Sequence, residues 1–148
     1  MKKLILAAVF AALCMPSFAQ EMSEAEIKRD KEIYENIQKQ VEHLESVLDL
    51  EGWQVFYADS ILTHNTYAMH AELKALQERK VSNTDLYYEV QFRWLDESYY
   101  AFQKILTPEQ WKKYLKDGAA RNKKARDKER ARKQGAGTKS CYFGGYQW

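Results

Sequence analysis

The chain has 148 residues, of which 45% are hydrophobic, 14% aromatic and 30% charged, with a formal net charge of +2. This length suffices for one small domain with a modest hydrophobic core. No Gly-rich phosphate loop, serine elbow or Cys–His pair is visible in the sequence. We therefore expect a protein that is not an enzyme and needs no cofactor.

The first residues have the pattern of a secretory signal peptide. Lys2 and Lys3 precede an apolar run from Leu4 to Leu13, and Ser17-Phe18-Ala19 offers small residues at a cleavage site. The apolar run is too short to span a membrane. We expect residues 1–19 to be removed and the mature protein to be exported. Because the protein is expected to be exported, we expect no nucleic-acid partner.

The first helix is expected to begin at Ser23, which forms a capping box with Glu26. Its apolar residues then recur at heptad-like spacing while its other faces are charged. This stripe consists of Ile27, Tyr34, Ile37, Val41, Leu44 and Leu48. So narrow a stripe predicts that the helix packs against one partner only.

Two further helices are expected, at Glu51–Lys80 and Thr84–Ile105, separated by turn-forming residues. The apolar face of the second is expected to comprise Trp53, Phe56, Tyr57, Ile61, Leu62, Met69, Leu73 and Leu76. The third carries the stripe Tyr88, Phe92, Leu95, Tyr99, Phe102 and Leu106. No segment has the two-residue period of a strand. The sequence predicts an all-α fold with three or four long helices in a bent helical hairpin.

A helix junction follows in the segment KILTPEQWKKYL, residues 104–115. Thr107 suits the N-cap, and Pro108 suits the first helical position, where a missing N–H costs nothing. Gln110 is placed to accept the N–H of the cap, which completes a capping box. Leu106 and Trp111 occupy the two positions of a hydrophobic staple. The motif predicts that one helix ends and the next begins here at a fixed angle.

A second, degenerate copy of this motif lies upstream, in LDLEGWQ. Leu50 and Gln54 are spaced as Leu106 and Gln110 are, but a glutamate and a glycine replace the threonine and proline. The repetition predicts two related turns, with the weaker cap at the upstream one.

Together, the signal sequence, the helical pattern and the two Leu-x-x-x-Gln motifs resemble the Spy/CpxP family of periplasmic proteins, which carry paired LTxxQ motifs. The resemblance covers Val47 to Leu115. It implies a cradle-like homodimer of long bent helices in the periplasm. It further implies an ATP-independent chaperone for unfolded proteins, an envelope-stress regulator or, in some branches of the family, a zinc-binding sensor.

The sequence between Leu50 and Leu115 contains thirteen aromatic residues. Adjacent pairs such as Tyr99-Tyr100 diverge by about 100° on a helix, so a helical hairpin cannot turn all of them inward. Some should face a dimer partner or a bound polypeptide. The candidates for this contact are Trp53, Tyr57, Tyr88, Phe92, Trp94, Tyr99 and Phe102.

Charge is segregated along the chain. From Gln20 to Trp111 there are 9 basic and 18 acidic residues, whereas from Lys112 to the end there are 12 basic and 3 acidic ones. This asymmetry predicts an interaction tail, or charge pairing between the two halves or between subunits. As an alternative to polypeptide binding, Arg121–Lys133 would contact an anionic envelope surface.

Residues 20–120 are expected to form the helical domain, and residues 121–148 a flexible basic tail. The segment after Gly118 has no side chain more apolar than alanine, so a solvated helix and a disordered segment are both compatible with it. The end of the chain is rich in glycine and aromatic residues. It contains Cys141, the one cysteine of the mature chain, which is either a tolerated residue or an intermolecular bridge.

The three histidines fit no metal-binding motif. His64 and His70 are six residues apart, which puts them on different faces of a helix, and His43 is far away in the sequence. We expect no metal site, and zinc sensing is a distant alternative.

Overall fold

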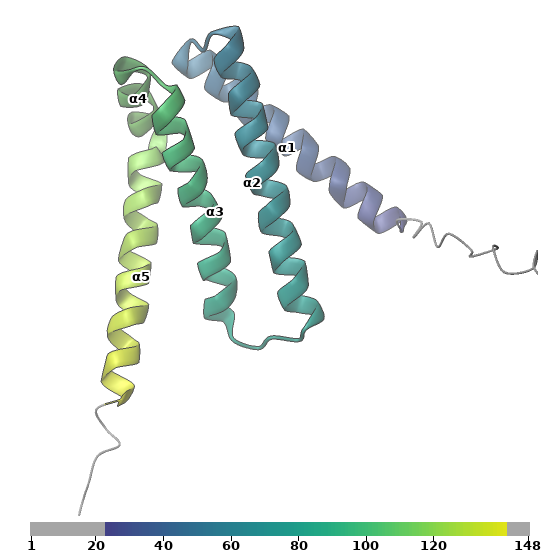
Figure 1. Ribbon diagram of the computed structural model, residues 1–148, viewed down its shortest axis with the longest axis vertical. Helices are drawn as coiled ribbons and strands as arrows, with labels where there is room; N and C mark the ends of the chain where they lie inside the picture. The colour runs from purple at the N-terminus through teal and green to yellow at the C-terminus, as the bar shows by residue number, and fades with distance from the viewer. Residues whose placement is uncertain (1–22, 142–148) are drawn as a thin grey trace, which may run out of the picture. The chain divides into compact units, whose positions relative to one another are not determined.

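The computed structural model describes residues 23–141, which are helical almost throughout and contain no strand (Figure 1). The elements are α1 (Glu24–Leu48), α2 (Gly52–Glu78), α3 (Thr84–Ile105), α4 (Pro108–Tyr114), the π-helical turn η1 (Leu115–Ala119) and α5 (Ala120–Cys141). The all-α class is confirmed. The chain divides into two compact units, Met1–Lys31 and Glu32–Trp148, and the packing described below is that of the second. The expected signal peptide lies outside the described residues.

Helix α1 has the expected start, and the C-terminal part of its expected apolar stripe is buried. Ser23 Oγ accepts the N–H of Glu26 at 3.3 Å, and the Glu26 carboxylate accepts the N–H of Ser23 at 3.1 Å. Within the second unit, the buried residues are Ile37, Val41, Leu44 and Leu48. Ile27 and Tyr34, which were expected in the same stripe, are exposed.

Helices α2 and α3 form the predicted antiparallel hairpin (Figure 1). Asn83 caps α3 by accepting the N–H of Asp85 at 3.0 Å, so the predicted break between the helices is confirmed. Side-chain hydrogen bonds also join the two arms. Asn65 donates to Ser98 Oγ at 3.0 Å.

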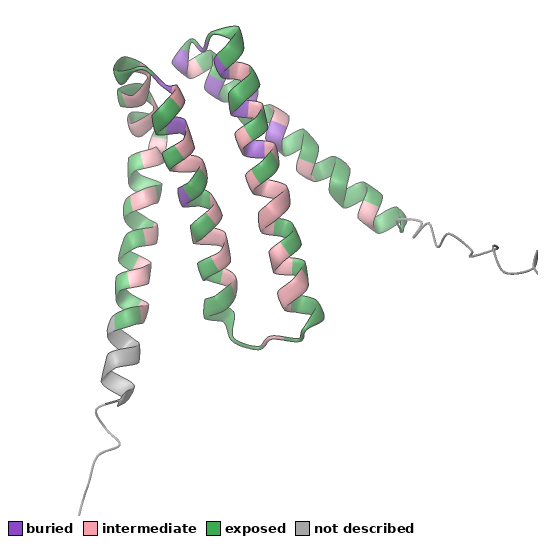
Figure 2. Ribbon diagram, in the orientation of Figure 1, coloured by how far each residue is buried: buried purple, intermediate pink, exposed green. Residues whose placement is uncertain are grey.

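The hydrophobic core of the second unit gathers toward the end of the hairpin where α2 begins and α3 ends (Figure 2). It consists of Ile37, Val41, Leu44, Leu48, Leu50, Ala58, Leu62, Phe102 and Leu106. Toward the α2–α3 turn, most side chains are partly buried or exposed.

The buried face of α2 differs from the predicted one. Gln54, Ala58 and Leu62 point inward, whereas the first three aromatic residues of the predicted apolar face are exposed. The cause is the rotation of α2 about its own axis, which decides which of its residues face the core. Burial of Gln54 turns Trp53 away by about 100° of the helical rotation.

After α4 the chain turns through η1, where Gly118 has φ of 120°. This conformation is strained for residues with a Cβ, and glycine adopts it readily. Helix α5 then runs beside α3 (Figure 1). The segment expected to form a flexible tail is therefore helical up to Cys141, and residues 142–148 lie outside the described part of the chain.

Candidate functional site

The second motif forms the predicted capping box. Thr107 Oγ1 accepts the N–H of Gln110 at 3.3 Å, and Gln110 Oε1 accepts the N–H of Thr107 at 3.0 Å. Pro108 occupies the first turn of α4. The backbone N–H groups of Thr107 and Gln110 are thus both satisfied by side chains. This fixes the direction in which α4 leaves α3.

The first motif makes the corresponding contact at the start of α2. Gln54 Oε1 accepts the N–H of Glu51, the N-cap residue, at 2.9 Å. The two turns are thus related in structure, as the repeated Leu-x-x-x-Gln spacing predicted.

The two motifs are joined by a reciprocal pair of amide hydrogen bonds, which we call the Gln–Gln pair. Gln54 Nε2 donates to Gln110 Oε1 at 2.8 Å, and Gln110 Nε2 donates to Gln54 Oε1 at 3.0 Å. Each amide also donates to the backbone of the other motif. Gln54 Nε2 lies 2.9 Å from the carbonyl oxygen of Ile105, and Gln110 Nε2 lies 3.3 Å from that of Asp49.

The Gln–Gln pair explains why a polar side chain is buried in α2. Gln54 is only 1% exposed. All four of its hydrogen bonds are made to other parts of the two motifs, so its burial leaves no polar group unpaired. The pairing itself could not be inferred from the separate motifs, because it depends on the distance between them in the folded hairpin.

Aromatic side chains surround the second motif. The ring of Trp111 packs edge-on against Tyr99, with ring centroids 5.0 Å apart, and lies 5.4 Å from Tyr114. Leu106 is buried in the core against which Trp111 packs, in agreement with the predicted staple. Burial raises the pKa of Tyr114 to about 12.

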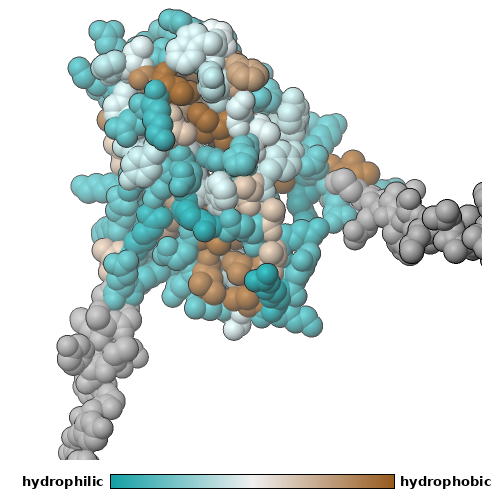
Figure 3. Space-filling model, in the orientation of Figure 1, coloured by the Kyte–Doolittle hydropathy of each residue, from teal (hydrophilic) through white to brown (hydrophobic). Residues whose placement is uncertain are grey.

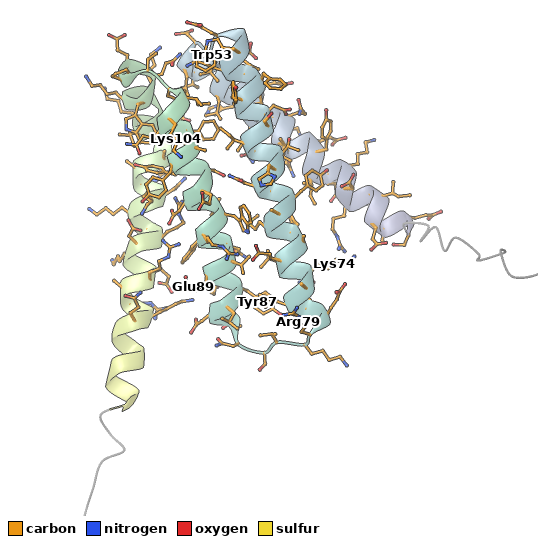
Figure 4. The ribbon with its side chains drawn as sticks, viewed as in Figure 1. Trp53, Lys74, Arg79, Tyr87, Glu89 and Lys104 are labelled. Carbon is orange, nitrogen blue, oxygen red and sulfur yellow. The ribbon has the colours of Figure 1, made fainter. Side chains whose placement is uncertain are left out.

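Exposed aromatic residues gather at the beginning of α2. Trp53 and Tyr57 are each 50% exposed, and Phe56, which was absent from the predicted binding residues, is 68% exposed. The ring of Tyr57 contacts Trp53 and Phe56 edge-on, with centroids 6.0 and 5.8 Å apart. Trp53 Nε1 donates to Glu51 at 2.7 Å. We call Trp53, Phe56 and Tyr57 the α2 aromatic cluster, and Figure 4 shows Trp53 at this end of the hairpin.

Both ends of the hairpin carry surface hydrophobicity. In Figure 3, hydrophobic residues gather toward both ends of the hairpin on the face shown, with hydrophilic residues between them. The α2 aromatic cluster belongs to the end at which the two motifs meet, so a rigid part of the fold supports it.

The other candidate binding residues have different environments. Tyr88 is exposed, and Phe92, Trp94 and Tyr99 are partly buried. Trp94 Nε1 donates to Glu72 at 3.1 Å across the hairpin. The prediction for Phe102 was wrong, because this residue is 1% exposed and belongs to the core. The spacing of the α3 stripe did not show which of its aromatic rings would be covered by α1 and α2.

A groove of about 640 Å³ runs beside the core. Its lining includes apolar side chains of the core, such as Leu62 and Phe102, and the polar side chains of Lys39, His43 and Arg126. All five α-helices and η1 contribute to its lining, which includes Tyr99 and Tyr114.

Charge pairing between the two halves of the chain, one of the predicted outcomes of the charge asymmetry, is present. Arg126 and Arg130 of α5 both form ion pairs with Asp96 of α3. Lys124 and Lys128 of the same helix are exposed. Contact between Arg121–Lys133 and an anionic surface remains a prediction. Lys124 and Lys128 are cations that could make this contact, because they are exposed.

The histidines are dispersed. His43 Nε2 lies 2.9 Å from Asp117 Oδ2, and the ring of His64 packs edge-on at 6.0 Å from that of Trp94. Among the side chains that the structure describes, those of residues 23–134, no three His, Cys, Asp or Glu groups gather where a metal ion would bind. The zinc alternative remains an untested prediction.

Comparison of the chain with protein-family models, curated proteins and solved structures gives no match in any of the three. Across the described residues, none of the helices combines the length and the apolar character needed to cross a membrane. The fold and its surfaces therefore carry the functional argument.

Proposed function

We propose that this chain is an exported, non-enzymatic protein that binds other polypeptides in the periplasm. Its action would be that of a Spy/CpxP-like ATP-independent chaperone or modulator of the envelope-stress response. The observation that carries the proposal is the α2 aromatic cluster, in which three adjacent aromatic side chains are each at least half exposed.

Exposed aromatic residues suit contact with unfolded polypeptides. An aromatic side chain buries about 150–250 Å² when covered, and tryptophan and tyrosine retain a polar group that tolerates a wet interface. Contiguous exposed apolar surface on a soluble domain commonly marks a binding site. Three such side chains on one helical turn and a half supply this surface without requiring a particular partner sequence.

The paired motifs support the same function through rigidity. The Gln–Gln pair and the capping box fix the first turn of α2, and the cluster projects from this turn and the next. A surface held rigid in the free protein loses less conformational entropy when a partner binds. We further propose the cradle-like homodimer that the family resemblance implies, which sedimentation of the mature chain would test.

Suppression of aggregation tests the proposal. The mature protein, mixed in equal amounts with an unfolding client and without ATP, should reduce light scattering. Replacing Trp53, Phe56 and Tyr57 together by alanine should remove most of this protection. Circular dichroism of the variant should still show a folded helical protein, because the altered side chains lie outside the core.

A matched control alters three exposed residues at the other end of the hairpin, in His70→Ala, Gln77→Ala and Ser82→Ala. This variant should protect as well as the original chain. Equal protection by the cluster variant and the original chain would exclude the α2 aromatic cluster as the binding surface. Failure of the original chain to protect several clients of different charge would refute the chaperone function.

A further inference from the structure

Helix α5 packs beside α3 although its sequence offers almost no apolar side chain. Between Ala120 and Gln134, nothing on α5 is more apolar than alanine. The contact must therefore depend on something other than hydrophobic burial. The side chains responsible are four cations spaced three, four and three residues apart, which we call the basic stripe: Lys123, Arg126, Arg130 and Lys133.

The basic stripe is covered while its neighbours are not. Its four side chains are between 11% and 24% exposed. Lys124 and Lys128, on the outer side of the same helix, are exposed. The helix thus directs one row of cations toward α3 and another toward solvent.

The opposing face of α3 combines acidic and aromatic residues. We call this row the acidic–aromatic stripe: Asp85, Tyr88, Phe92, Asp96 and Tyr100. Its members recur every three or four residues, which places them on one side of the helix. Glu89 lies beside them, 3.8 Å from Arg130, and Figure 4 labels it on the side of α3 toward α5.

Cations of α5 lie over aromatic rings of α3 along the length of the contact. The distances from cation to ring centroid are 5.9 Å for Lys123 and Tyr100, 5.5 Å for Arg130 and Phe92, and 3.9 Å for Lys133 and Tyr88. All three are within the range of a cation–π interaction. Lys133 Nζ is also 2.7 Å from Asp85 Oδ1.

Asp96 is the centre of this contact. It is 8% exposed, and its carboxylate pairs with Arg126 at 2.8 Å and with Arg130. Burial by itself raises the pKa of Asp96, but the hydrogen bonds from Arg130 and Arg126 outweigh that effect and hold the pKa below its ordinary value. The charged carboxylate is thus matched to two guanidinium groups.

A contact of this kind is reversible. Ion pairs and cation–π contacts weaken with salt, because charges near the surface are screened over about 8 Å at physiological ionic strength. If α5 left α3, both stripes would be hydrated and no charge would stay buried without a partner. The stripe on α3 is therefore available to any other segment that presents cations at the same spacing.

We propose that the acidic–aromatic stripe of α3 is a binding site for Lys/Arg-rich segments of other polypeptides, and that α5 occupies this site within the same chain. The proposal rests on the proposed polypeptide-binding function and names a class of partner for it. Two residues of the acidic–aromatic stripe, Tyr88 and Phe92, are among the aromatic residues that the sequence predicted to contact a partner.

The chemistry of the stripe selects this partner. Its carboxylates repel anionic lipid and acidic peptide, whereas guanidinium groups pair with carboxylates and also stack on aromatic faces. A segment with the spacing of the basic stripe would reproduce the contacts that α5 now makes. Such a segment must displace α5, so α5 lowers the apparent affinity of the site.

The test measures binding of a fluorescent peptide with the sequence of Ala120–Gln134 to the full chain by anisotropy. In the variant Arg126→Ala/Arg130→Ala, α5 loses its pairs with Asp96 and uncovers the stripe. If α5 covers the stripe nine-tenths of the time, the peptide should bind this variant about tenfold more tightly. The milder variant Lys133→Ala, which keeps the Asp96 pairs, should show a smaller gain.

The matched control is Lys124→Ala/Lys128→Ala, which removes the same charge from the outer side of α5. Its affinity for the peptide should equal that of the original chain. Adding Asp96→Asn and Phe92→Ala to the Arg126→Ala/Arg130→Ala variant should abolish the gain. Equal affinities of the Arg126→Ala/Arg130→Ala, Lys133→Ala and control variants for the peptide would overturn the proposal, provided that circular dichroism shows all three folded.

This result is separable from that of the aggregation assay. Tighter peptide binding by the opened variant, without any protection of clients, would refute the chaperone function and leave the site on α3 in place. Protection of clients with unchanged peptide affinity would retain the proposed function and refute the site.

Discussion

The Gln–Gln pair leads to a prediction about the free energy of unfolding. We consider the single substitutions Gln54→Ala and Gln110→Ala and the double variant that combines them. Both side chains make four hydrogen bonds each, and two of these bonds join one glutamine to the other. Gln54 is buried, whereas Gln110 is partly exposed.

The magnitudes follow from these bonds. Each net hydrogen bond contributes about 1 kcal/mol, and a buried partner left unpaired costs about 1–3 kcal/mol. Gln54→Ala should lower the free energy of unfolding by about 3–4 kcal/mol, because it also leaves the carbonyl of Ile105 unpaired. Gln110→Ala should cost about 2 kcal/mol, since water reaches the groups it leaves. The double variant should cost about 2 kcal/mol less than the sum, because the two shared bonds are lost only once.

Urea unfolding followed by circular dichroism and tryptophan fluorescence measures these differences. Gln103→Ala, which alters an exposed glutamine of α3, is the control and should cost less than about 0.5 kcal/mol. If the effects of Gln54→Ala and Gln110→Ala simply added, the two amides would not act as a pair and the reasoning would be wrong.

Two further predictions concern packing and pH. Phe102→Ala should lower the free energy of unfolding by about 3–5 kcal/mol because it opens a cavity in the core, while Phe56→Ala should change it by less than about 0.5 kcal/mol; urea unfolding of both variants compares them. Because the folded-state pKa of Asp96 is lowered, the stability it contributes is present above its ordinary pKa of about 4 and is lost as the pH falls through the lower folded value. The protection of the α5 amides, measured as the exchange rate relative to the intrinsic rate at each pH, should therefore fall in acid, and Asp96→Asn should remove this dependence; a protection factor in α5 that does not change with pH would contradict the assignment.

Much of the fold could be predicted from local patterns. The limits of α3 and the capping box at Thr107 follow from side chains that act on their own backbone within one helical turn, so they need no knowledge of the tertiary structure. The repeated Leu-x-x-x-Gln spacing likewise predicted two related turns. The direct bond between Gln54 and Gln110 was missed because it joins residues far apart in the sequence.

Predictions of burial were less accurate, for a physical reason. Helical periodicity shows which residues share a face but not which face the neighbouring helices cover. Phe102 and Phe56 both belong to apolar stripes, yet the first is in the core and the second is exposed. The basic segment gave the same difficulty, because its docking depends on acids and rings of α3 that periodicity within α5 does not show.

Site-specific photo-crosslinking tests the central claim most directly. A benzophenone side chain at Phe56, in the α2 aromatic cluster, should crosslink to an unfolding client, whereas the same group at the exposed Gln77, toward the α2–α3 turn, should give little product. Equal crosslinking at the two positions, or crosslinking at Gln77 alone, would contradict the assignment of the α2 aromatic cluster as the polypeptide-binding surface.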